Sequence, residues 1–148
     1  MHRTPFNGHT PRVLMVDDNP HDLHLIGEAF AECGVPAHLR HANDADQALA
    51  ALSQPDARID LMLLDLNMPR VDGRALLARL ATMPEARDMR IVVLTSSSRA
   101  ADMQFCSEMG ALSYYVKPTT WDEYLALVRS LKVFCCQPVS DEALPIAQ

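Results

Sequence analysis

The sequence predicts an α/β domain with a doubly wound, five-stranded parallel sheet and five helices on its two faces. Three observations support this. Short aliphatic runs alternate with helical patterns five times along the chain, which is typical of crossover units. Several of these runs lack polar alternation, as in strands buried on both faces. The length of 148 residues suits one domain with a sizeable core.

The first strand is expected at 12–16, where the sequence reads RVLMV. The helix after it carries signals at both ends. Asn19 can cap its first turn, Pro20 suits the first helical position, and Gly34 can end it in a left-handed conformation. This first strand–helix unit sets the pattern for the rest of the chain.

The other elements follow in the same alternation. Strands are expected at 37–42, 59–65, 90–96 and 113–117, and helices at 44–54, 73–83, 99–110 and 120–136. The chain therefore divides into an N-terminal lead-in (1–11), the folded domain (12–136) and a C-terminal tail (137–148).

Composition argues against two classes of partner. The formal net charge is −6, whereas a general nucleic-acid binder needs Lys and Arg to neutralise phosphates. No apolar run approaches the roughly 18 residues of a membrane span, and the N-terminus lacks the apolar centre of a signal peptide. We therefore expect a cytoplasmic protein that binds neither nucleic acid nor membrane.

Five polar side chains stand at the carboxyl ends of the expected strands: Asp17, Asp18, Asp65, Thr95 and Lys117. In an open parallel sheet these ends form the rim where ligands bind. Three crowded carboxylates repel unless a cation intervenes, and oxygen ligands suit Mg²⁺ or Mn²⁺. Metal, ammonium and hydroxyl can surround a transferring phosphoryl group, so a carboxylate here can become a phosphorylated nucleophile.

Four motifs carry a resemblance to a known family. They are VDD (16–18), LLDLNMPRVDG (63–73), VLTSS (93–97) and YYVKP (114–118). In this order they resemble the receiver domain of bacterial two-component response regulators, over roughly residues 12–135. The resemblance implies the flavodoxin-like receiver fold with strand order 2-1-3-4-5. It also implies a phosphorylation switch rather than an enzyme.

The resemblance implies roles for individual residues. Asp65 would accept the phosphoryl group and ligate the metal, with Asp18 as a direct ligand and Asp17 bound through water. Asn67 would contribute its backbone carbonyl to the metal. Thr95 would donate a hydrogen bond to the phosphoryl group, and Lys117 would form an ion pair with it. The resemblance also implies a cis peptide bond before Pro118.

Two further expectations concern signal output. Tyr114 resembles the family's aromatic switch residue, which would move inward after Thr95 turns toward the phosphoryl group; the alternative is an edge-strand aromatic with a solvated hydroxyl. The last helix has two apolar stripes, where one suffices to cover a sheet. The surplus favours a homodimer through the fourth and fifth helices, with Tyr124, Leu127, Leu131 and Phe134 as its face. The alternative is one wide buried face under the C-terminal tail.

No DNA-binding pattern follows residue 136, so we expect a stand-alone receiver. The segments LDLNMPRVDGRALL (64–77), TMPEARDMR (82–90) and SLKVF (130–134) resemble the regulators paired with bacterial phytochromes, which implies a sensor histidine kinase as partner. Alternatives are another histidine kinase, an intermediate position in a phosphorelay, or an unphosphorylated scaffold. A phosphatase of the haloacid dehalogenase type is more distant, because it needs an acid where Asn67 stands.

Overall fold

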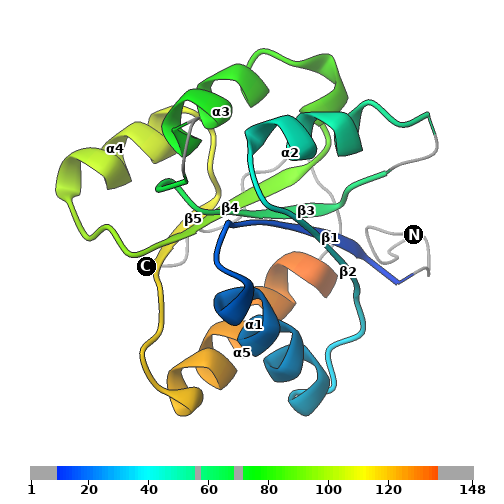
Figure 1. The fold of residues 1–148 in the computed structure, drawn as a ribbon, viewed down its shortest axis with the longest axis vertical. Helices are drawn as coiled ribbons and strands as arrows, with labels where there is room; N and C mark the ends of the chain where they lie inside the picture. The colour runs from blue at the N-terminus through cyan, green and yellow to red at the C-terminus, as the bar shows by residue number, and fades with distance from the viewer. Residues whose placement is uncertain (1–9, 56–57, 69–71, 137–148) are drawn as a thin grey trace.

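The computed structural model describes residues 10–55, 58–68 and 72–136 (Figure 1). Most of the expected lead-in and the whole expected tail lie outside these ranges. The strands are β1 (Arg12–Val16), β2 (His38–Ala42), β3 (Leu61–Leu64), β4 (Arg90–Thr95) and β5 (Ser113–Val116). The helices are α1 (Pro20–Glu32), α2 (Ala45–Leu52), α3 (Gly73–Leu80), the 3₁₀ turn η1 (Pro84–Ala86), α4 (Ala100–Glu108) and α5 (Trp121–Cys136).

The five strands form one parallel sheet in the order β2-β1-β3-β4-β5. Figure 1 shows the three layers: α2, α3 and α4 cover one face of the sheet, and α1 and α5 cover the other. The predicted fold class and strand order are therefore confirmed. Within the described ranges, no helix has the length and apolar character needed to cross a bilayer.

The local signals in the sequence also explain where α1 begins and ends and where α3 ends. The Asn19 side chain accepts from the backbone N–H groups of His21 and Asp22 at the start of α1, and Gly34 beyond its end has φ +65°. The helix expected at 73–83 ends at Leu80 instead. Met83 is extended (φ −92°, ψ 125°), because a residue before proline avoids the helical region.

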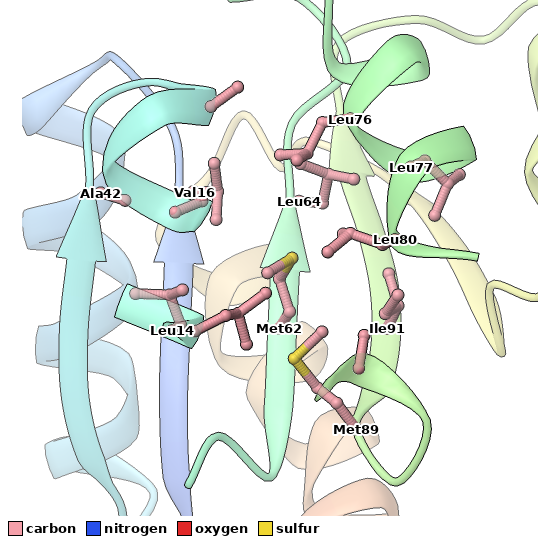
Figure 2. Packing of buried hydrophobic residues seen from close by; sticks show 14 of the residues in the cluster. Leu14, Val16, Ala42, Met62, Leu64, Leu76, Leu77, Leu80, Met89 and Ile91 are labelled. Carbon is pink, nitrogen blue, oxygen red and sulfur yellow. The ribbon is translucent and has the colours of Figure 1, made fainter. Parts of the chain in front are cut away.

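The core consists of two apolar clusters, one on each face of the sheet. Figure 2 shows the first, which contains strand residues such as Leu14 and Met62 together with Leu76 and Leu80 of α3. The second packs strand residues such as Val13 against α1 and α5. Side chains alternate between the two clusters along each central strand, as the pleat requires.

The apolar face of α5 corrects the expected dimer surface. Tyr124, Leu127, Leu131 and Phe134 are all buried, with Leu131 fully enclosed. They share one inward face with Val128, which is also fully buried. The expected dimer face is therefore wrong for these four residues, because a helix packed on both the sheet and α1 buries more than a narrow stripe. The C-terminal tail of the alternative interpretation lies outside the described residues.

Candidate functional site

Hydrogen bonds that extend the sheet place the predicted polar residues at one rim. Beyond the regular strands, the N–H of Asp65 donates to the carbonyl of Val16 at 2.9 Å, and the N–H of Lys117 donates to that of Thr95 at 2.8 Å. Asp17 continues the ladder from β1 to β2 in the same way, at 3.0 Å from Ala42. The register of the sheet thus fixes these side chains relative to one another.

Three carboxylates converge at the ends of β1 and β3. One oxygen each from Asp17, Asp18 and Asp65 lies within 4.8 Å of the others. Asp17 and Asp65 are each 4 % exposed, while Asp18 is open to solvent. These hard oxygen donors, partly buried and partly open to water, fit a divalent cation such as Mg²⁺ or Mn²⁺, which keeps several waters.

Burial opposes the negative charge on Asp17 and raises the pKa of its carboxyl group. The hydrogen bonds from Lys117 and from the backbone N–H of Asn19, the latter at 2.9 Å, lower this pKa but do not outweigh burial. A divalent cation among the three carboxylates would stabilise their charged forms.

Lys117 lies at the centre of the acidic side chains. Its Nζ is 2.7 Å from Asp22 Oδ2, 2.9 Å from Asp17 Oδ2 and 3.3 Å from Asp65 Oδ2. Burial alone would lower the pKa of this ammonium, but the hydrogen bonds to Asp22 and Asp17 and the charges of Asp17 and Asp65 raise it above its ordinary value. Lys117 is therefore a fixed positive charge beside Asp65.

Asn67 connects Asp65 with Thr95. Its backbone N–H donates to Asp65 Oδ1 at 3.1 Å, and its side-chain amide donates to Thr95 Oγ1 at 3.3 Å. Thr95 is fully buried at the end of β4. Pro69, in the motif LLDLNMPRVDG, lies outside the described residues.

A polar network extends from Thr95 to α3, α4 and β5. The Ser97 N–H lies 3.5 Å from Thr95 Oγ1, and the Ser97 hydroxyl donates to buried Asp102 at 2.6 Å. Arg74 binds both oxygens of Asp102, at 2.7 Å each. Tyr114, half-buried, donates its hydroxyl to the Ser97 carbonyl at 2.8 Å, so this hydroxyl is bonded within the protein.

Gly73 brings α3 against the end of β3. Its N–H donates to the Leu66 carbonyl at 2.9 Å. A Cβ at this position would lie 2.3 Å from the Asp65 carbonyl oxygen and 2.6 Å from Leu66 Cα. Only glycine allows this approach without a backbone shift, so Gly73 holds the strand end that carries Asp65.

The structure brings Asp17, Asp18, Asp65 and Lys117 together as the sequence predicts, and it links Thr95 to them through Asn67. One expectation is wrong: the described residues contain no cis peptide bond, so the bond before Pro118 is trans. Trans is the more stable form even before proline, by about 0.5–1 kcal/mol.

Sequence reasoning missed Asp22, a fourth carboxylate at the rim. It lies in the first turn of α1, five residues after Asp17. Its place in a helix that starts at the carboxyl end of β1 is the signal that could have found it. The Arg74–Asp102 ion pair was also missed, because its partners are 28 residues apart and no local pattern joins them.

Comparisons with known proteins all indicate the same family. Residues 13–129 match the model of the family described as "Response regulator receiver domain". The response regulator Rcp1 of Synechocystis is 29% identical over 133 residues, covering 86% of this chain and 90% of Rcp1. The transcriptional regulator RpaA of Synechocystis is 33% identical over 121 residues, 82% of this chain. The chain spans about half of RpaA, 48% of its length.

Two solved structures have the same fold. One is the phosphorylated cyanobacterial phytochrome response regulator RcpA, with a TM-score of 0.78 and 30% identity over 86% of this chain and 94% of RcpA. The other is the Mn²⁺-bound form of Rcp1, with a TM-score of 0.76 and 28% identity over 88% and 97% of the two chains.

Proposed function

The chain belongs to the response regulator receiver domain family, and on this premise we propose that Asp65 accepts a phosphoryl group from a sensor histidine kinase. One observation carries the proposal. Asp65 directly follows the fully buried central strand β3, lies beside Asp17 and Asp18, and faces the Lys117 ammonium at 3.3 Å. This is a carboxylate nucleophile with positive charge fixed next to it.

In the proposed step, a carboxylate oxygen of Asp65 attacks the phosphorus of a kinase phosphohistidine. The new O–P bond forms as the P–N bond breaks, and the electron pair returns to the imidazole, which takes up a proton. Lys117 stabilises the charge that develops on the phosphoryl oxygens. Thr95 is held 3.3 Å from the Asn67 amide and can turn its hydroxyl to a phosphoryl oxygen instead.

Asp18 and Asp65 would hold Mg²⁺ or Mn²⁺ directly, with Asp17 bound through water and the Asn67 backbone carbonyl as a further ligand. The bound ion would neutralise charge on the phosphoryl group. The three clustered carboxylates support this assignment, as does the Mn²⁺ bound by the related Rcp1. The cluster has more negative charge than Lys117 alone can balance.

The protein would act as a switch rather than as an enzyme with a turnover substrate. A phosphoryl group adds about −1.5 to −2 charge, which would draw the Thr95 hydroxyl and change the Ser97 segment to which Tyr114 is bonded. Tyr114 would then shift the packing of α4, β5 and α5 between two populations. The proposal includes a cytoplasmic location, where ATP for a histidine kinase is available.

We propose a bacterial phytochrome as the kinase, supported by the likeness to RcpA, a phytochrome response regulator. We also propose a homodimer through the α4–β5–α5 face. After the correction above, its candidate residues are the exposed apolar side chains Met103, Val116 and Trp121, which are 39–46 % exposed. A monomeric mass at micromolar concentration, with and without phosphorylation, would exclude the dimer.

The test of the proposed function is transfer of labelled phosphate. A purified phytochrome histidine kinase and an unrelated histidine kinase are first phosphorylated and then mixed with this protein and Mg²⁺. We expect an acid-stable but alkali-labile label on the wild type and none on Asp65→Asn. Asp46→Asn, which changes an exposed carboxylate of α2, is the matched control and should be labelled normally. Labelling of Asp65→Asn would refute the proposal, and equal transfer from both kinases would refute the phytochrome pairing.

A further inference from the structure

Asp22 is the carboxylate closest to the Lys117 ammonium. Its Oδ2 lies 2.7 Å from Lys117 Nζ, compared with 3.3 Å for Asp65. The Asp22 side chain is 15 % exposed, much like the 16 % of Lys117. Its other oxygen accepts a hydrogen bond from the Tyr124 hydroxyl of α5 at 3.4 Å. Asp22 therefore joins α1, β5 and α5 at the rim of the sheet.

The orientation of Lys117 follows from these contacts. An ammonium has three N–H donors, and here three carboxylates surround it, with Asp22 nearest and Asp65 farthest. The nucleophile thus has the weakest contact with the positive charge that would assist its reaction. To pair fully with a phosphoryl group on Asp65, Lys117 has to move away from Asp22.

We propose that Asp22 is a positioning residue that competes with the phosphoryl group for Lys117 and so lowers both the rate of phosphorylation and the lifetime of the product. The inference rests on the proposed role of Asp65. Asp22 does not touch the reacting atoms; it acts through Lys117. Tyr124 strengthens the competition, because its hydroxyl helps to hold the Asp22 carboxylate in place.

A purely structural role offers a different explanation. An acidic residue in the first turn of a helix stabilises that helix by its interaction with the helix dipole, and Asp22 occupies such a position. Asp46 occupies the same kind of position in α2 but is exposed. Asp46→Asn therefore reproduces the helix effect of Asp22→Asn at a position on another helix.

The test compares wild type, Asp22→Asn, Asp22→Glu and Asp46→Asn, with acetyl phosphate as the donor and Mg²⁺ present. Asparagine keeps an oxygen for Tyr124 but removes the charge that attracts Lys117. A partly exposed ion pair of this kind corresponds to about a two- to fivefold change in rate. We expect Asp22→Asn to be phosphorylated about two- to fivefold faster and to lose its phosphoryl group more slowly. Asp22→Glu, which restores the charge, should return both rates toward those of the wild type.

A second measurement needs neither donor nor metal. The ¹⁵Nζ signal of Lys117 in the unphosphorylated protein should move in Asp22→Asn and stay in place in Asp46→Asn, while thermal unfolding shows whether each variant is folded. An unchanged or lower phosphorylation rate in folded Asp22→Asn, or an equal effect of Asp46→Asn, overturns the inference. If the wild type takes no label on Asp65, the proposed function itself fails. If the wild type is labelled and Asp22→Asn is labelled at the same rate, only the proposed role of Asp22 is refuted.

Discussion

The position of α4 depends on a buried ion pair, and this can be tested quantitatively. Asp102 and Cys106 are the only residues of α4 that are fully buried, and Phe105 packs against the same core while partly exposed. Few apolar side chains of α4 are thus fully buried, and one of its two buried residues is charged. Asp102 accepts two hydrogen bonds from Arg74 at 2.7 Å each and one from Ser97 at 2.6 Å. The perturbation is Asp102→Asn, which keeps the shape of the side chain but removes its charge.

Breaking a fully buried pair costs about 3–5 kcal/mol. Two features reduce this cost here: the Arg74 side chain is 26 % exposed, and it also pairs with Asp72 at 2.8 Å. Water and Asp72 can therefore partly stabilise the Arg74 guanidinium once the charge of Asp102 is removed. We expect a loss of about 2–3 kcal/mol in the free energy of unfolding. For a domain of this size that is a fall in Tm of roughly 4–12 °C.

The assay is urea or thermal unfolding of wild type, Asp102→Asn, Arg74→Met and the double variant. Because the two side chains bond each other, their effects should be non-additive by about 1–2 kcal/mol. Amide hydrogen exchange should also become faster in α4 than in α1. Additive effects, or a fall in Tm below about 2 °C for Asp102→Asn, would refute the conclusion that this pair holds α4.

Two further predictions concern pH and the approach of α3 to β3. Hydrogen bonds from Arg74 and Ser97 lower the pKa of Asp102 below its ordinary value of 3.8. The contribution of the charged carboxylate is therefore fully present above the ordinary value and is lost progressively as pH falls from it toward the lowered value. The stability difference between wild type and Asp102→Asn should be constant near neutrality and shrink below about pH 4, and a difference as large at about pH 2 as at neutrality would contradict this. Gly73→Ala should lower the free energy of unfolding by about 1–3 kcal/mol and slow phosphorylation, because its Cβ would meet the Asp65 carbonyl at 2.3 Å. The control is Gly27→Ala, whose Cβ would lie 3.8 Å from Leu39. Equal Tm values for the two variants would count against the steric argument.

Much of the candidate site could be predicted because the fold places strand ends by rule. Once alternating strands and helices indicate a parallel sheet, the residues after each strand must meet at one rim. Asp17, Asp65 and Lys117 lie there because they directly follow β1, β3 and β5. The same rule covers only residues next to strand ends, so it did not include Asp22, which reaches the rim from the first turn of α1.

The errors have physical causes as well. Helical periodicity shows that a residue such as Leu131 is on an apolar face, but the width of the buried face depends on what packs against it, here both α1 and the sheet. The isomer of the bond before Pro118 was carried over from the family resemblance. It depends on the surrounding chain, since the intrinsic preference of about 0.5–1 kcal/mol is small.

By itself, the sequence determined the alternation of elements, the two-sided burial of the central strands and the set of acidic and basic groups at the rim. These follow from local periodicity and from residues next to strand ends, which are properties of short segments. Only the tertiary structure decided that Asp22 is nearest to Lys117, that Arg74 anchors Asp102, and that α5 buries its expected partner face. Such contacts join residues far apart in the chain, and their distances depend on how the helices pack on the finished sheet.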